Sequence, residues 1–132
     1  MVLDTSAIID FLRKGEKTRR IVEREKNRGD MVGMTGISLF ELLTPIFHRR
    51  LLEKEKGVRA FARESVFLGL DAAATDEASK IMGSLLRIGK TVNALDVLIS
   101  GIAVANGVDE VVTSDKDFQT IQKVANISVT FV

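Results

Sequence analysis

The stretch "MVLDTSAIIDFL", residues 1–12, contains a change of hydrophobic pattern that decides the fold class. Residues 1–3 are an apolar run that predicts a short buried strand, and Ile8, Ile9 and Leu12 then follow the spacing of one helix face. Asp4 stands between the two elements. A short apolar run followed by an acid and a helix returns in "VVTSDKDF", residues 111–118. A strand that leads directly into a helix is the unit from which parallel sheets are built.

Strands and helices alternate along the rest of the chain. Apolar runs predict strands at residues 1–3, 31–35, 66–70, 110–113 and 127–132. Several of these runs are apolar at successive positions, which is typical of strands covered on both faces. We therefore expect a single domain over residues 1–132, built as a three-layer α/β/α sandwich around a central, mainly parallel sheet.

The longest expected helix covers residues 38–56, with Pro45 as a candidate kink. A shorter helix is expected to follow at residues 58–64. The long helix carries an apolar stripe, which is interpreted as core, with part of it available to a dimer: Leu39, Leu42, Leu43, Ile46 and Phe47.

The composition excludes several kinds of chemistry. The chain has no cysteine, so disulfides, thiolate metal sites and thiol nucleophiles are absent, and this suits a reducing cytoplasm. The only histidine, His48, cannot by itself form a His-pair site. No apolar run approaches the roughly 20 residues that a membrane helix needs, so we expect a cytoplasmic protein with no membrane partner.

The net charge is only +1, but the basic residues are unevenly distributed. Residues 13–28 and 48–63 are rich in Arg and Lys, with acids interspersed. Two interpretations stay open, namely solvated helix faces and a rim that faces phosphate groups.

Four acids have positions that suggest a shared site. Asp4 and Asp115 follow predicted strands, and ligands of open α/β sheets bind beyond the carboxyl ends of strands. Glu41 and Asp96 are expected in the first turns of their helices. Asp96 lies in the apolar segment "NALDVLISGIAVA", where a buried charge needs a partner.

Helix capping is the alternative explanation for these acids. Asp4 can cap the first helix, and Asp71 follows a strand in the same way with no role beyond capping. Three pairs have the form of a capping box, with a polar residue three positions before an acid: Ser38 and Glu41, Asn93 and Asp96, and Ser114 and Asp117.

A cluster of carboxylates without His or Cys suits a hard divalent cation such as Mg²⁺ or Mn²⁺. Such a cation can polarise a phosphoryl oxygen and stabilise a leaving oxygen, which is the chemistry of phosphodiester hydrolysis. Four small hydroxyl residues stand beside the acids and can orient a carboxylate, contact a phosphate or cap a helix: Thr5, Ser6, Ser38 and Thr113.

Four motifs together, "VLDTSAII", "ISLFELL", "NALDVLISGIA" and "VVTSDKDF", resemble the PIN-domain ribonucleases, in order and at similar spacing. The sequence is most similar to the VapC-like toxins of the VapBC toxin–antitoxin class. The resemblance implies an Mg²⁺- or Mn²⁺-dependent endoribonuclease that leaves 5′-phosphate and 3′-hydroxyl ends. It also implies an RNA substrate, a cognate antitoxin that inserts into the acidic groove, and a homodimer.

Carried over position by position, the resemblance implies that Asp4, Glu41, Asp96 and Asp115 are catalytic and hold the metal. Asp117 stays open as a supporting acid or as a closer ligand than Asp115. Thr113, Ser6 and Ser38 are expected to support the site or to touch substrate. Two other functions stay open: a PIN-domain nuclease of RNA processing or quality control, and a catalytically silent PIN-like binding module.

Overall fold

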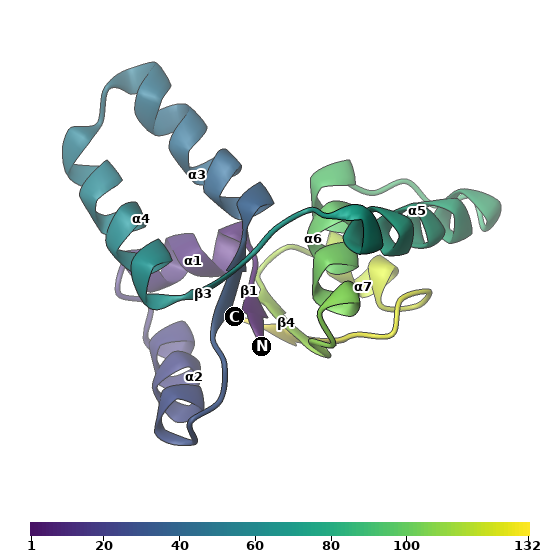
Figure 1. Cartoon of the computed structure of the whole chain (residues 1–132), viewed down its shortest axis with the longest axis horizontal. Coiled ribbons are helices and arrows are strands. Elements are labelled where there is room, and N and C mark those ends of the chain that lie inside the picture. Colours follow the sequence, from purple (N-terminus) through teal and green to yellow (C-terminus); the bar gives the residue numbers. More distant parts are fainter.

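The computed structural model describes residues 1–132 and has a parallel sheet between two layers of helices (Figure 1). The five strands have the order β3-β2-β1-β4-β5, and every adjacent pair is parallel. The expected three-layer α/β/α sandwich is confirmed. In chain order the elements are β1 Val2–Leu3, α1 Thr5–Leu12, α2 Glu16–Asn27, β2 Gly33–Thr35, α3 Gly36–Arg49, α4 Leu52–Glu64, β3 Val66–Leu68, α5 Ala72–Arg87, α6 Ala94–Ala105, β4 Glu110–Thr113, α7 Asp117–Ile121 and β5 Ser128–Phe131.

Successive residues of the central strands face opposite layers. Leu3 and Val112 belong to the core shared with α1 to α4, whereas Val2 and Val111 belong to the core shared with α5 to α7. All four side chains are fully buried. The two apolar faces of each central strand explain why the sequence shows runs of apolar residues instead of an alternating pattern.

The predicted helix over residues 38–56 is divided in the structure. Arg50 has a left-handed backbone conformation with φ of 55°, and it ends α3 before Leu52 begins α4. Pro45 lies inside α3 without ending it. The predicted helix at residues 58–64 is the second half of α4, so the prediction placed the break in the wrong position.

Helix α6 is almost wholly apolar and packs closely against α5. A Cβ added to Gly101 would lie 2.6 Å from the backbone nitrogen of Ala78, so the approach of the two helices depends on glycine at this position. No helix in the structure has both the length and the apolar character needed to cross a membrane.

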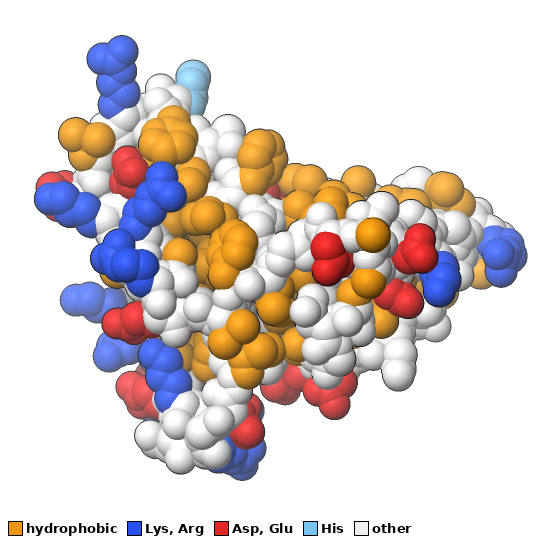
Figure 2. Space-filling model, in the orientation of Figure 1, with side chains coloured by type: hydrophobic (Ala, Val, Ile, Leu, Met, Phe, Trp, Pro, Cys, Tyr) orange, Lys and Arg blue, Asp and Glu red, His pale blue; other side chains and the backbone are white.

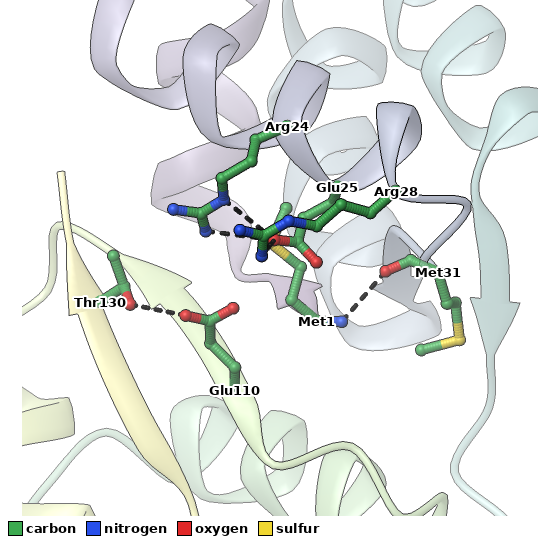
Figure 3. A network of polar contacts seen from close by, with 7 residues as sticks. All are labelled: Met1, Arg24, Glu25, Arg28, Met31, Glu110 and Thr130. Carbon is green, nitrogen blue, oxygen red and sulfur yellow. Dashed lines mark hydrogen bonds and ion pairs between the residues drawn. The ribbon is translucent and has the colours of Figure 1, made fainter.

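At the amino ends of the central strands, the polar groups are paired with one another (Figure 3). The Met1 ammonium group donates to the carbonyl of Met31 at 3.0 Å. Glu25, which is only 7% exposed, is held by the guanidinium groups of Arg24 at 3.1 Å and Arg28 at 3.8 Å. A buried carboxylate at this end therefore has cationic partners, and this distinguishes it from the carboxylates at the opposite end.

Candidate active site

Asp4 and Thr113 lie side by side at the carboxyl ends of β1 and β4. Leu3 pairs with Val112 in the parallel register, so the next residue of each strand reaches the same edge of the sheet. The Asp4 backbone N–H continues the ladder by donating to the Val112 carbonyl at 3.0 Å. Two residues that are 109 positions apart in the sequence thus meet through strand pairing alone.

Both carboxylate oxygens of Asp4 accept hydrogen bonds. Oδ1 accepts from the Ser6 hydroxyl at 2.7 Å and from the Ala7 backbone N–H at 2.9 Å, and Oδ2 accepts from the Thr113 hydroxyl at 2.5 Å. The bond from Ala7 confirms that Asp4 caps α1. Burial raises the pKa of Asp4, while the three hydrogen bonds act in the opposite direction.

Asp96 is buried in the first turn of α6, and its Oδ2 is the one buried side-chain oxygen or nitrogen without a hydrogen-bond partner. Burial raises the pKa of Asp96 to about 8, helped by hydrogen bonding with the Asp115 carboxyl and by the negative charges of Asp115, Asp4 and Glu41. Glu25 has two arginines at a similar degree of burial, whereas Asp96 has only other acids. An oxygen left unpaired in this setting favours a cation as its missing partner.

Asp115 and Asp117 complete a compact group with Asp96, in which carboxylate oxygens lie within 4.8 Å of one another. The Asp115 backbone N–H donates to the Thr113 hydroxyl at 2.8 Å, which fixes the loop after β4. The Asp117 backbone N–H donates to Oδ1 of Asp115 at 2.9 Å. Both acids are half-buried, so the group opens toward solvent on their side.

Glu41 approaches the same acids from α3. Its Oε1 accepts a hydrogen bond from the Thr5 hydroxyl at 2.7 Å, and the Ser38 hydroxyl lies 3.1 Å from that of Thr5. Helix α3 begins at Gly36, with Thr35 as its N-cap, so the predicted capping box of Ser38 and Glu41 is wrong. With no helix terminus to cap, Glu41 is held instead by a hydroxyl from α1.

The remaining capping predictions have mixed outcomes. Asp71 caps α5 through the Ala74 N–H at 2.9 Å, as expected. The Asn93 side chain caps α6 by accepting from the Leu95 N–H at 2.9 Å. The capping box with Asp96 does not form, because the Asn93 N–H donates to Asp117 and not to Asp96.

The predicted box of Ser114 and Asp117 does not form. The Ser114 N–H donates to the Ser6 hydroxyl at 2.9 Å, and the residue at the N-cap of α7 is Lys116, whose side chain makes no capping bond. Ser6 therefore joins the loop after β4 to Asp4.

The structure places every predicted site residue at this edge of the sheet, although in unequal positions. Asp96, Asp115 and Asp117 form the compact group, and Asp4 and Glu41 border it closely enough for their charges to raise the pKa of Asp96. Two contacts were not predicted, namely the bond from Thr5 to Glu41 and the bond from the Asn93 N–H to Asp117. Both join distant segments, and no local pattern indicates them.

The donor set fits a hard divalent cation. All side-chain donors in the compact group are carboxylate oxygens, which Mg²⁺ and Mn²⁺ prefer over nitrogen or sulfur. No lysine or arginine is ion-paired with Asp4, Asp96, Asp115 or Asp117 within 4.0 Å. Positive charge from outside the chain is therefore the simplest way to relieve the repulsion among these acids.

The fold and this group of acids define a member of the PIN domain family, and the family model of the PIN domain matches residues 1–124. The chain belongs to this family, in which the nucleases hydrolyse nucleic acids. No curated protein matches the sequence.

Solved toxin–antitoxin structures share the fold. A chain of VapBC2 from Rickettsia felis, bound to a promoter DNA fragment, superposes with a TM-score of 0.86 at 17% identity, covering 99% of this chain and 97% of that one. A chain of DNA-bound VapBC from Salmonella typhimurium gives 0.78 at 24% identity, with 98% and 96% covered. VapBC-1 from Haemophilus influenzae gives 0.79 at 21% identity, again covering 98% and 96%. At these identities the likeness is one of fold.

Proposed function

We propose that this protein is an Mg²⁺- or Mn²⁺-dependent endoribonuclease and the toxin component of a toxin–antitoxin pair. The observation that carries the proposal is the buried, unpartnered Oδ2 of Asp96, which faces other carboxylates and no cation of the chain. Burying an unpaired carboxylate destabilises the folded state, and a bound metal ion would supply the missing positive charge.

Asp4, Asp96 and Asp115 are the proposed metal ligands, and Glu41 is proposed to hold a second cation or to position the attacking water. Oδ2 of Asp4 accepts only one hydrogen bond, from Thr113, so it retains a lone pair for a cation. When bound, Mg²⁺ or Mn²⁺ supplies positive charge that polarises a phosphoryl oxygen and stabilises the leaving oxygen.

The chain itself contributes orientation and exclusion of water. Ser6 and Thr113 hold the Asp4 carboxylate, and Thr5 holds that of Glu41. Thr113 is fully buried and Asp4 is nearly so, hence bulk water does not compete for the bond between these two residues. Carboxylates that are already oriented lose little conformational freedom when a metal and a phosphate arrive.

The proposed partners are an RNA substrate and a cognate antitoxin, and the supporting observation for the antitoxin is that the structural neighbours are toxin–antitoxin complexes. A groove of about 450 Å³ between α1, α3 and α4 reaches Glu41 and has an apolar wall that includes Leu12, Leu42 and Ile46. A partner segment seated there would cover Glu41. A cytoplasmic location is part of the same proposal.

A homodimer is also proposed, supported by large apolar side chains that remain exposed on the face shown in Figure 2 and elsewhere on the surface. Phe40 and Phe47 of α3 and Phe67 of β3 are each at least half exposed. Of the predicted stripe in the 38–56 segment, Leu42 and Ile46 are core, whereas Phe47 is on the surface. Light scattering tests the dimer. We expect a dimeric wild type and a monomeric Phe67→Glu variant, and a monomeric wild type would contradict the proposal.

Cleavage of RNA with Asp96→Asn, beside Asp71→Asn as a matched control, tests the activity. Asp71 also follows a strand and caps a helix, but it stands apart from the acids of the site. We expect the wild type and Asp71→Asn to cleave RNA only with Mg²⁺ or Mn²⁺, and Asp96→Asn to be inactive while folded. Full activity of Asp96→Asn, or cleavage in excess EDTA, would contradict the proposal. Co-purification with the product of a neighbouring gene tests the antitoxin.

A further inference from the structure

Asp117 and the backbone of Asn93 form a contact that joins the two segments bearing Asp115 and Asp96. The Asn93 N–H donates to Oδ2 of Asp117 at 2.9 Å, across 24 residues of sequence. Helix α6 starts at the next residue, and Asn93 is its N-cap. The contact therefore holds the N-terminal end of α6.

Hydrogen bonds continue on both sides of this contact. On one side, the Asp117 N–H donates to Oδ1 of Asp115, and the Asp115 N–H donates to the Thr113 hydroxyl, which also bonds Asp4. On the other side, Asn93 accepts from the Leu95 N–H through its side chain and from the Asp96 N–H through its carbonyl, at 2.9 and 3.1 Å. The chain of bonds runs unbroken from Asp4 to the backbone of Asp96.

We propose that Asp117 is a positioning residue that holds Asp96 opposite Asp115 by accepting the Asn93 N–H, and that it is not itself a metal ligand. Its carboxylate lies within 4.8 Å of the other two, but it is the only one of the three that accepts an N–H from the segment where α6 begins. The separation of Asp96 from Asp115 then depends on a bond that neither residue makes. The proposal extends the metal-dependent function above by assigning unequal roles to the two acids of "SDKD".

An amide in place of the Asp117 carboxylate distinguishes the two roles. Asn at residue 117 keeps an oxygen that can accept the Asn93 N–H, but a neutral amide is a poor ligand for Mg²⁺ or Mn²⁺. A positioning residue therefore tolerates Asp117→Asn and not Asp117→Ala, whereas a ligand tolerates neither. Loss of an outer hydrogen-bond partner typically weakens metal binding about 10- to 100-fold.

The donor can be removed separately at Asn93. Its φ is −60°, which a proline ring adopts without strain, so Asn93→Pro deletes the N–H at an acceptable backbone conformation. Asn93→Ala loses the same side-chain cap but keeps the N–H. The difference between these two variants therefore reports on the bond to Asp117, apart from the loss of the cap.

The experiment measures Mn²⁺ affinity by calorimetry and, without metal, amide hydrogen exchange at residue 93 and through the first turn of α6. We expect Asp117→Ala to bind Mn²⁺ at least tenfold more weakly than the wild type. We expect Asn93→Pro to bind Mn²⁺ at least tenfold more weakly than Asn93→Ala. Asp117→Asn should stay within about threefold. Asp117→Ala should also speed exchange at Asn93 at least tenfold, and Asp71→Ala should change neither measurement. In the Asn93→Pro background, Asp117→Ala should add nothing.

Equal weakening by Asp117→Asn and Asp117→Ala would overturn the proposal in favour of a ligand role. Unchanged exchange at Asn93 in Asp117→Ala would overturn it as well, and this measurement needs no metal. If the wild type binds no Mn²⁺ and cleaves no RNA, the proposed function fails. Amide hydrogen exchange at Asn93 still tests the contact between Asn93 and Asp117 in that case. If the wild type is active and Asp117→Ala matches it, this proposal alone fails.

Discussion

The Thr5 hydroxyl donates to Oε1 of Glu41 at 2.7 Å and joins the first residue of α1 to α3 across 36 positions of sequence. Thr5 follows Asp4 directly, so one dipeptide both supplies a carboxylate and orients another. Ser38, fully buried, lies 3.1 Å from the same hydroxyl and supports it from the side of α3. The orientation of Glu41 therefore depends on the position of the first residue of α1.

Replacing Thr5 with Val removes this hydroxyl and keeps the shape of the side chain. We expect RNA cleavage to fall about tenfold, since Glu41 loses its oriented partner, while the half-buried position limits the cost to folding to about 1 kcal/mol. Thr5→Ser keeps a hydroxyl and should retain most of the activity. Cleavage rates at saturating Mg²⁺, with urea unfolding of each variant, measure both effects. Equal rates for Thr5→Val and the wild type would show that Glu41 needs no such partner.

Thr113→Val is expected to harm stability more than Thr5→Val. The Thr113 hydroxyl is fully buried, donates to Asp4 and accepts from the Asp115 N–H, so its loss removes a partner from one buried carboxylate oxygen and from one half-buried N–H. An unsatisfied buried group costs about 1–3 kcal/mol, and we expect a loss within or slightly above this range. Urea unfolding without metal measures it. A change below about 0.5 kcal/mol would mean that water replaces the hydroxyl.

The stability of the metal-free protein should fall as the pH rises. The pKa of Asp96 is raised from 3.8 to about 8, so the folded state binds more protons than the unfolded state between these values. The raised pKa of Asp4 acts in the same direction. Unfolding free energy then decreases with pH across this window, because its slope follows the difference in bound protons between the unfolded and folded states.

Melting temperatures in EDTA from pH 5 to pH 8.5 test this dependence. We expect a steady decline in the wild type and a shallower one in Asp96→Asn, which lacks the titrating group. Asp96→Asn should also melt higher than the wild type at pH 8.5, since it removes charge from a repulsive cluster. Saturating Mg²⁺ should flatten the wild-type curve. A flat wild-type curve in EDTA would show that the acids do not repel each other as described.

Gly101→Ala should destabilise the fold by about 1–3 kcal/mol, because the added methyl group meets the backbone of α5 and the helices must separate. The nearest backbone atom, the nitrogen of Ala78, would lie only 2.6 Å away. Gly83→Ala in α5 is the matched control, since its Cβ meets nothing within 4 Å and alanine is the better helix former by about 1 kcal/mol. Thermal unfolding of both variants should therefore show shifts of opposite sign.

The strands and the acids at their ends could be predicted from the sequence because both are local signals. The segment at residues 110–113 is apolar enough to give the bounds of β4, and Asp4 and Asp115 follow strands wherever the strands lie. The order of the strands placed these acids together, since β1 and β4 are neighbours.

Other features depend on tertiary contacts and could not be predicted. The end of α3 requires a left-handed Arg50, which no residue preference indicates, in contrast to glycine. Glu41 has the spacing of a capping partner for Ser38, but the N-cap of the helix is Thr35, three residues before Ser38. The bond from Asn93 to Asp117 involves a backbone N–H, and a backbone donor has no signature in the sequence.

Basic side chains beside the groove should bind the RNA backbone. Figure 2 shows Lys and Arg gathered over the side of the molecule formed by α2 and α4, where ion pairs such as Lys56 with Glu53 and Arg59 with Glu55 occupy several of them. Arg49 and Lys54 line the groove that reaches Glu41, and neither forms an ion pair within 4.0 Å. These unpaired cations in the groove that reaches Glu41 are therefore the best candidates for phosphate contacts.

Arg49→Gln and Lys54→Gln, each made in the inactive Asp96→Asn background, should weaken binding of single-stranded RNA. Each lost phosphate contact should reduce the slope of log affinity against log salt by about 0.7, since fewer counterions are released. Lys80→Gln is the matched control, because Lys80 lies on α5 and pairs with Glu77 at 3.5 Å. Fluorescence anisotropy between low and high salt gives the slopes. If all three variants bind RNA as the background protein does, the basic side chains are solvated helix faces with no role in RNA binding.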